Sequence, residues 1–145
     1  MRTLYIMVGA PGSGKTTYAK TLDGVRVSFD DIKEDLYGDA NINGNPNEVS
    51  AEFRKRIWNL IQKNKSVIID YMGLTRKSRK HFIKTYGPYF DEIVAVHINT
   101  PVEKCIEQDS KRNRNVPIDV IRSRHNTLVA PSESEGFNKI ITVEN

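Results

Sequence analysis

A glycine-rich segment near the N-terminus, GAPGSGKTT at residues 9–17, constrains the fold more than any other part of the sequence. It follows a short apolar run, Leu4 to Val8, and precedes a stretch suited to a helix from Lys15 to Leu22. The segment matches the pattern G-x-x-x-x-G-K-[S/T] at every position, which in this setting predicts a phosphate-binding loop. The alternative is a glycine-rich turn with an incidental lysine, and the flanking strand and helix argue against it.

The residue types of this segment suit an anion. Glycines allow successive backbone N–H groups to turn toward a phosphate, and the following helix offers its positive end. We expect Lys15 to follow charge onto a transferred phosphoryl group and the Thr16 hydroxyl to ligate Mg²⁺. The residues expected to bind the nucleotide are Gly9, Ala10, Pro11, Gly12, Ser13, Gly14, Lys15, Thr16 and Thr17.

The rest of the chain alternates between strand and helix patterns, which predicts a parallel α/β sheet with helices on both faces. Five strands are expected, and 145 residues suit a single domain spanning 1–145. A helix is expected from residue 101, with Thr100 as its N-cap and Glu103 completing a capping box. The expected strands are residues 4–8, 25–29, 66–70, 92–98 and 138–143, and the other expected helices 30–38, 48–64, 76–86 and 118–128.

Composition indicates the class of protein and the cellular compartment that we expect for it. The sequence is 38% hydrophobic and 28% charged, as in globular proteins, and no apolar run approaches the roughly 20 residues of a membrane span. No secretory signal is expected at the N-terminus. The single cysteine, Cys105, favours a reducing cytoplasm, which could be that of a host cell if the protein is phage-encoded. The net charge of +4 is compatible with a polyanionic partner.

Three aspartates follow expected strands. In open α/β sheets ligands bind outside the carboxyl ends of the strands, so Asp30, Asp31 and Asp70 should face the phosphate loop. A carboxylate at Asp30 can accept a proton from an attacking alcohol, and Asp70 can support Mg²⁺. The alternative is that these residues cap the helices or turns that follow them.

Two segments are rich in basic residues. In residues 75–84, which contain no acid, the charges are expected to form a solvated helix face. The second segment, residues 111–124, includes a non-helical connector that could close over a nucleotide, and we expect Arg112 and Arg114 to contact its phosphates. The basic residues are Arg76, Lys77, Arg79, Lys80 and Lys84 in the first segment, and Lys111, Arg112, Arg114, Arg122 and Arg124 in the second.

The order of the segments GAPGSGKTT, SFDD, IID, DSKRNRNVPIDVIRS and APSESEGF resembles the 5′-polynucleotide kinases of the bacteriophage and mammalian repair types. The resemblance covers essentially the whole chain, and the last two segments are more specific than the phosphate loop. It implies a P-loop NTPase fold of the nucleotide-kinase type, with ATP as donor and Mg²⁺ as cofactor. Asp30 then matches the general base, Asp70 the strand-end aspartate and Arg112 the lid arginine.

The sequence departs from this family only on the acceptor side. Ser28-Phe29 replaces the usual Asn-Arg pair before the catalytic aspartate, and Tyr71-Met72 replaces the usual Thr-Asn pair after the strand-end aspartate. Lys33 stands where the phage enzyme has an arginine that grips the acceptor phosphate. Phe29 or Tyr71 could stack on a terminal base or could simply pack.

The leading hypothesis is transfer of the γ-phosphoryl group of ATP to the 5′-hydroxyl end of DNA or RNA. One alternative is a small-molecule kinase acting on a nucleoside, a sugar acid or an antibiotic. Another is a nucleotide-binding switch with negligible transfer. The sequence does not distinguish DNA from RNA, and it does not indicate an oligomeric state.

Overall fold

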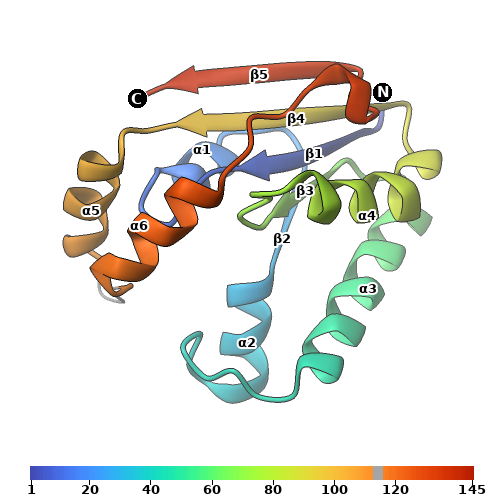
Figure 1. Ribbon diagram of the computed structural model, residues 1–145. Coiled ribbons are helices and arrows are strands. Elements are labelled where there is room, and N and C mark those ends of the chain that lie inside the picture. The colour runs from blue at the N-terminus through green and yellow to red at the C-terminus, as the bar shows by residue number, and fades with distance from the viewer. Residues whose placement is uncertain (113–115) are drawn as a thin grey trace.

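A five-stranded parallel sheet forms the centre of the computed structural model, which describes residues 1–112 and 116–145 (Figure 1). The order across the sheet is β2-β3-β1-β4-β5, and every neighbouring pair is parallel. Each expected strand differs from the observed one by a single residue at one or both ends, so the predicted fold class is confirmed. The strands are β1 (Thr3–Val8), β2 (Val25–Ser28), β3 (Val67–Asp70), β4 (Glu92–Asn99) and β5 (Lys139–Glu144).

The helices also form where the sequence pattern places them: the helix Arg76–Tyr86 has both of its expected ends, and the others have at least one shifted end. The first helix stops at Ala19 instead of Leu22, because backbone hydrogen bonds to Tyr18 and Ala19 turn the chain there. Phe29 begins a helix instead of ending a strand. The helices are α1 (Lys15–Ala19), α2 (Phe29–Tyr37), α3 (Pro46–Gln62), α4 (Arg76–Tyr86), α5 (Val102–Ser110) and α6 (Ile118–Thr127), with short 3₁₀ turns η1 (Gly87–Tyr89) and η2 (Glu133–Glu135).

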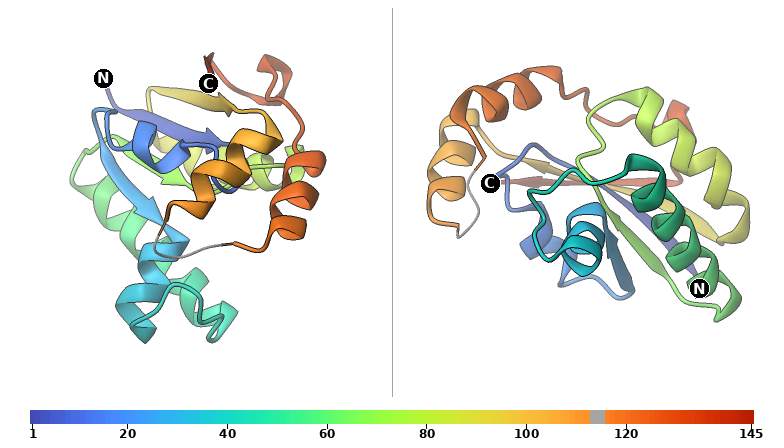
Figure 2. Two further views of the ribbon diagram at one scale, coloured as in Figure 1. Left: turned by 90° about the vertical axis from the view of Figure 1, so that its left-hand side faces the viewer. Right: turned by 90° about the horizontal axis from the view of Figure 1, so that it is seen from below.

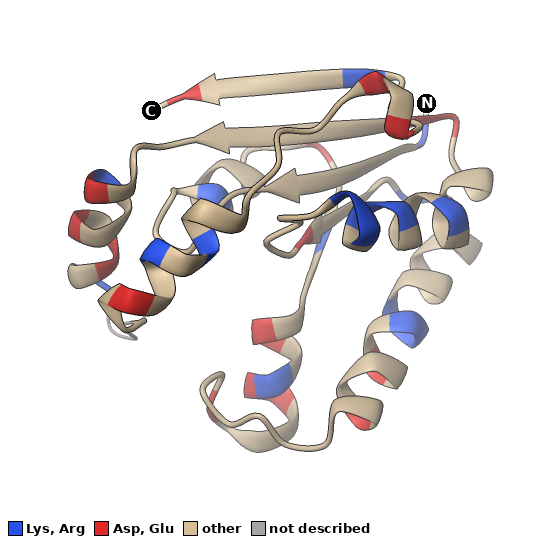
Figure 3. Cartoon of the chain, viewed as in Figure 1, with Lys and Arg blue, Asp and Glu red and all other residues tan. Residues whose placement is uncertain are grey.

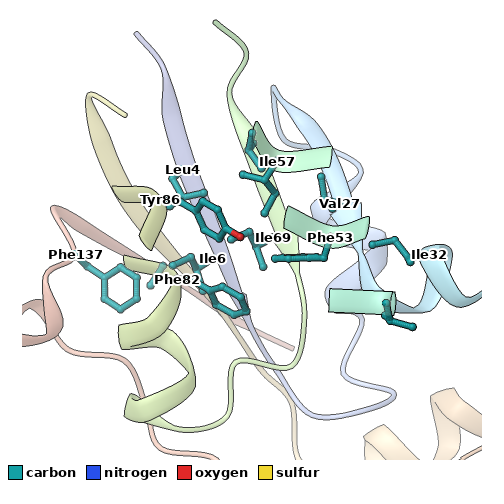
Figure 4. Packing of buried hydrophobic residues seen from close by; sticks show 13 residues of the cluster. Leu4, Ile6, Val27, Ile32, Phe53, Ile57, Ile69, Phe82, Tyr86 and Phe137 are labelled. Atoms are coloured by element: carbon teal, nitrogen blue, oxygen red, sulfur yellow. The ribbon is translucent and has the colours of Figure 1, made fainter. Parts of the chain in front are cut away.

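The two faces of the sheet have different cores because side chains alternate along each strand. Leu4 and Ile6 of β1 pack with Phe53 of α3 and Phe82 of α4 on one face (Figure 4). Met7 of the same strand packs on the other face, against the short helix α1. The helices α3 and α4 therefore cover one face, and α1 covers the other.

The helices α5 and α6 lie beyond the carboxyl ends of the central strands (Figure 1 and Figure 2). A small cluster of Ala10, Cys105 and Ile121 joins them to the glycine-rich loop. Burial raises the pKa of the Cys105 thiol, which suits a packing role. This arrangement brings the basic residues after α5 and on α6 close to the glycine-rich loop.

The structure corrects one predicted cap and supports another. The Thr75 hydroxyl accepts a hydrogen bond from the Ser78 backbone N–H and caps α4 as expected. The N-cap of α5 is Pro101, however, and no side chain caps that helix, so the predicted capping box at Thr100 is wrong. The Thr100 hydroxyl instead donates to the Ser13 carbonyl at 2.8 Å. A tertiary contact with the glycine-rich loop replaces the local one.

The basic face of α4 also differs from expectation at one position. Arg79 is fully buried, so the expectation of a solvated helix face is wrong for this residue. Its guanidinium pairs with Glu135 at 2.7 Å and 3.1 Å and donates to the backbone carbonyls of Gly73 and Val129. The other four basic side chains of the helix, Arg76, Lys77, Lys80 and Lys84, are exposed as expected.

Candidate functional site

The carboxyl ends of three adjacent strands meet at one edge of the sheet. Ser28 at the end of β2 is in register with Asp70 at the end of β3. The Gly9 backbone N–H, directly after β1, donates to the Met72 carbonyl at 2.9 Å. A pocket of about 690 Å³ opens at this edge. The sequence segments GAPGSGKTT, SFDD and IID therefore converge, as the strand-end argument predicted.

The glycine-rich loop has the conformation of an anion-binding turn. Gly12 and Gly14 have φ values of +81° and +95°, which side-chain-bearing residues rarely adopt. The Gly12 carbonyl accepts from the Gln108 side chain at 2.9 Å, and the Ser13 carbonyl accepts from Thr100 and Asn145. These side chains fix the peptide planes of the loop from outside.

Asp70 is the centre of a polar cluster at the pocket wall. Its carboxylate accepts from the Lys15 ammonium at 3.1 Å, from the Thr16 hydroxyl at 3.0 Å and from Arg26 Nε at 2.6 Å. The Asp70 side chain is only 1% exposed. Burial by itself raises the pKa of Asp70, but the charges and hydrogen bonds of Lys15 and Arg26 outweigh it and hold the pKa below its ordinary value. The carboxylate is thus kept ionised.

This cluster suits a metal ion that is coordinated partly by protein oxygens and partly by the phosphates of a nucleotide. The Thr16 hydroxyl and the Asp70 carboxylate are oxygen ligands of the kind that Mg²⁺ prefers. Within residues 1–112 and 116–145 no group of three or more His, Cys, Asp or Glu could hold a metal ion. A magnesium ion at this place would therefore take its remaining ligands from phosphate and water, which is its usual mode in nucleotide sites.

Arg26 is a site residue that the sequence pattern did not reveal. It lies in β2, where its guanidinium bridges Asp70 of the next strand and Asp31 of α2, each at 2.6 Å. The Arg26 side chain is 19% exposed. The side chain links the wall of the nucleotide pocket to the first turn of the helix that carries Asp30.

The acceptor side of the pocket begins with α2. Asp30 and Asp31 lie in the first turn of this helix, and Ser28 is the N-cap, with its hydroxyl accepting from the Asp31 backbone N–H. The alternative that these aspartates cap the helix is therefore wrong. Asp30, Lys33, Phe29 and Tyr71 all line the pocket.

The two aromatic residues both pack and line the pocket. The Phe29 ring stacks on Phe53 with centroids 4.3 Å apart and an interplanar angle of 10°. The Tyr71 ring is tilted against Phe29 at 5.1 Å. Both side chains are only partly buried and line the pocket, so part of each ring is available to a ligand.

The basic C-terminal segment reaches the pocket from the opposite side. Arg112 lines the pocket, and its guanidinium pairs with Asp109 at 3.4 Å. The same Asp109 side chain, almost fully buried, accepts from the Val116 backbone N–H at 2.8 Å. Asp109 therefore anchors both flanks of the connector. The predicted phosphate contact of Arg114 lies outside the described residues.

The pocket brings together most of the residues that the sequence identified. Of the expected residues, Gly9 and Asp31 do not line the pocket: Gly9 supports the loop through its backbone, and Asp31 pairs with Arg26. Sequence reasoning missed the pocket residues on the loop between α2 and α3 and on α5, because neither carries a motif. Besides the site residues expected from the sequence, the lining includes Ala40, Asn41, Asn43, Met72, Gln108, Val116, Val120 and Arg124.

Among the described residues, no helix is both long enough and apolar enough to span a membrane.

Comparison with known proteins gives one family match and several relatives. Residues 4–133 match the family model described as an AAA domain. A curated relative, "Transcription factor bHLH140" of Arabidopsis thaliana, is 28% identical over 94% of this chain. The chain spans only 15% of that protein, so the relative's name describes a much longer molecule.

Solved structures extend the comparison. Two structures of the Pnkp1/Rnl/Hen1 complex, one of them named an RNA repair complex, match with 31% and 28% identity and TM-scores of 0.64 and 0.74. These matches cover 73% and 88% of this chain but only 38% and 44% of the other chain. A sugar kinase from Janibacter sp. HTCC2649 has 20% identity, a TM-score of 0.65 and coverage of 99% and 85%, which shows a shared fold.

Proposed function

The chain belongs to the protein family described as an AAA domain, a P-loop kinase domain, and on that premise we propose that it transfers the γ-phosphoryl group of ATP to the 5′-hydroxyl end of a nucleic acid. The observation that carries the proposal is the position of Asp30, which lines the same pocket as Lys15 and Thr16. A carboxylate and a phosphate loop that face one pocket suit transfer to an alcohol. The similarity to a chain of the Pnkp1/Rnl/Hen1 RNA repair complex supports a nucleic acid as the source of that alcohol.

Each of these residues would have a separate role in an in-line phosphoryl transfer. Asp30 would orient the 5′-hydroxyl and accept its proton as the oxygen attacks the γ-phosphorus, while the bond from that phosphorus to the oxygen of ADP breaks. Lys15 and Arg112 would neutralise the charge on the transferring group. A magnesium ion held by Thr16 and Asp70 would supply further neutralisation of the phosphate oxygens.

Lys33 would hold the acceptor. It lies one helical turn after Asp30 on α2 and lines the same pocket, so its ammonium can reach a phosphate of the strand whose end is at Asp30. Lysine binds phosphate as a point charge and not with the bidentate geometry of arginine. This difference suits a strand that is held by several weak phosphate contacts.

Incubation with γ-labelled ATP and a 5′-hydroxyl oligonucleotide tests the proposal. We expect label at the 5′ end of the oligonucleotide, and no label on an otherwise identical oligonucleotide that already carries a 5′-phosphate. DNA and RNA versions compared in parallel establish the preference. Efficient labelling of a sugar acid, a nucleoside or an antibiotic, without labelling of the DNA or the RNA oligonucleotide, would contradict the proposal.

The variant Asp30→Asn separates an enzyme from a nucleotide-binding switch. The amide keeps the size of the side chain but cannot accept the proton, so turnover should be abolished while ATP affinity, measured by calorimetry, stays within about twofold of wild type. Unchanged transfer by this variant would remove Asp30 from the mechanism.

A further inference from the structure

A second pocket, of about 510 Å³, lies between α3 and α4 beside the first. Its wall is mainly aromatic, and the rings come from both helices and from the strand ends. Phe53 and Phe82 form its floor, since both are almost fully buried in the core (Figure 4). The residues that line it are Phe29, Ser50, Phe53, Arg54, Tyr71, Thr75, Lys77, Ser78, His81, Phe82 and Tyr86.

The two pockets are neighbours and share two lining residues. Phe29 and Tyr71 line both of them. Phe29 directly precedes Asp30, the proposed general base, and Tyr71 directly follows Asp70. A ligand whose reacting hydroxyl lies at Asp30 therefore extends into the second pocket if it leaves the first one past these two rings.

The charges around the second pocket are of one sign. Arg54 of α3 and Lys77 of α4 line it, and both side chains are exposed. None of the residues that line it is an aspartate or a glutamate. Figure 3 shows the run of basic residues along α4. An aromatic floor with a cationic rim suits a ligand that joins a flat ring to an anion.

We propose that this pocket binds a nucleobase of the acceptor strand, from a nucleotide beyond the one whose 5′-hydroxyl is phosphorylated. The proposal rests on the proposed function, because the strand's end must lie at Asp30. The terminal nucleotide occupies the first pocket, so the base in the second pocket belongs to a nucleotide farther along the strand. The base stacks on the exposed part of the Phe29 or Tyr71 ring, and the adjoining phosphate lies near Lys77 and Arg54.

This arrangement predicts a preference for acceptors longer than one nucleotide. A nucleoside 3′-monophosphate fills the first pocket only, whereas a short oligonucleotide also gains the stacking contact. Loss of one base–aromatic contact typically weakens binding by roughly 5- to 150-fold. We therefore expect wild-type kcat/KM for an oligonucleotide to exceed that for the mononucleotide by a factor in this range.

Blocking the pocket is the direct test, and α3 offers a matched pair of positions. Ser50 lines the pocket and is half-buried, whereas the adjacent Ala51 is exposed and lines neither pocket. Ser50→Trp should fill the pocket and raise KM for the oligonucleotide at least about fivefold. It should leave kcat and KM for the mononucleotide unchanged. Ala51→Trp should leave kcat and KM unchanged for both acceptors.

The cationic rim has its own matched pair on α4. Lys77→Ala should raise KM for the oligonucleotide, and Lys80→Ala should not, since both lysines are exposed but only Lys77 lines the pocket. Equal effects of Ser50→Trp and Ala51→Trp on the oligonucleotide, in an otherwise active enzyme, would overturn the subsite while the proposed function stands.

A binding measurement without ATP separates the two proposals. Oligonucleotides with a single 2-aminopurine at the first to fourth nucleotide report stacking by loss of fluorescence. We expect the strongest quenching at a nucleotide beyond the first, and its loss in Ser50→Trp but not in Ala51→Trp. Absence of quenching at every such position overturns the subsite. Absence of 5′ labelling by wild type overturns the proposed function.

Discussion

At the scale of single residues, Asp70 shows how the site is held before any ligand binds. Its buried carboxylate is contacted by Lys15, Thr16 and Arg26. The first two belong to the phosphate loop and were expected to be site residues, whereas Arg26 acts from the neighbouring strand. A buried carboxylate requires such partners, because an unpaired charge in this position is strongly destabilising. We infer that Arg26 is a positioning residue that sets the orientation of Asp70 and, through Asp31, of α2.

Replacement of Arg26 by alanine should slow the transfer step. Loss of a residue that orients a metal-supporting carboxylate typically costs about 10- to 100-fold in activity. We expect this loss in kcat, measured with saturating ATP and oligonucleotide, while KM for ATP changes little. Arg26→Lys should recover part of the rate, since a lysine can reach one of the two aspartates but cannot bridge both.

Arg56 provides the control for this prediction. Its guanidinium also pairs with two acids, Glu52 at 3.0 Å and Asp35 at 2.9 Å, but it lies on α3 and lines neither pocket. Arg56→Ala should leave kcat unchanged. If both variants lose activity to the same extent, or if the loss from Arg26→Ala follows its melting temperature, the positioning role is refuted.

At the scale of elements, Arg79 joins α4 and the loop before it to a segment 50 to 56 residues later in the sequence. From α4 it contacts η2 through Glu135, the loop at Gly73 and the segment at Val129. Its side chain is 0% exposed and that of Glu135 is 6% exposed. The pair thus holds the segment after α6 against the face of the sheet that α4 covers.

Glu135→Gln should destabilise the fold in a pH-dependent way. Breaking a buried ion pair on one side typically costs about 3–5 kcal/mol. Burial opposes ionisation of Glu135, but hydrogen bonds and charge from Arg79 and the Ser132 backbone N–H lower its pKa below the ordinary 4.5. The ionised carboxylate therefore contributes its full stabilisation above about pH 4.5 and loses it as the pH falls through the lower folded-state value.

Denaturant unfolding between pH 7 and pH 3 checks this prediction. The wild-type free energy of unfolding should fall more steeply below about pH 4.5 than that of Glu135→Gln, so that the two curves converge in acid. Glu133→Gln, an exposed neighbour in the same turn, should follow the wild-type curve. Parallel curves for wild type and Glu135→Gln would show that the ion pair contributes no pH dependence.

The elements that the sequence predicted well are those specified by local signals. Short apolar runs fixed the strands, and Thr75 caps its helix with a neighbour three residues away. The predictions that were wrong or missing concern side chains whose partners lie far away in the sequence. Thr100 donates to the phosphate loop instead of its own helix, and Arg26 meets Asp70 only because β2 and β3 are adjacent. The second pocket could not be predicted from the sequence either, because periodicity identifies Phe53 and Phe82 as core residues but does not reveal a pocket beside them.

At the scale of the whole molecule, charge decides how an acceptor approaches. The net charge is +4, and the exposed basic face of α4 lies on the side of the aromatic pocket. Lys33, Arg54 and Lys77 line the two pockets on the acceptor side. Three phosphate contacts of this kind would make a large part of the binding free energy electrostatic, because each releases counterions from the strand.

Activity on oligonucleotides should therefore be sensitive to salt. For three phosphate contacts with a single strand, the logarithm of the association constant should fall against the logarithm of salt concentration with a slope of about −2. The measurement is 1/KM for the oligonucleotide between 50 and about 200 mM salt, the range over which such slopes are usually seen. The mononucleotide acceptor is the control and should give a much smaller slope. Equal slopes for both acceptors would contradict the strand-binding reading.

The contacts of the phosphate loop also determine when, during folding, the protein becomes able to bind a nucleotide. β1 lies in the middle of the sheet, and its partners β3 and β4 come 60 or more residues later. The carbonyls of Gly12 and Ser13 are held by side chains from Gln108 and Thr100. The nucleotide loop is thus synthesised before the strands and side chains that hold it, and we expect it to take its final shape only after α5 has emerged. Nucleotide binding should consequently report a late stage of folding, although the loop's sequence motif precedes the segments that hold it.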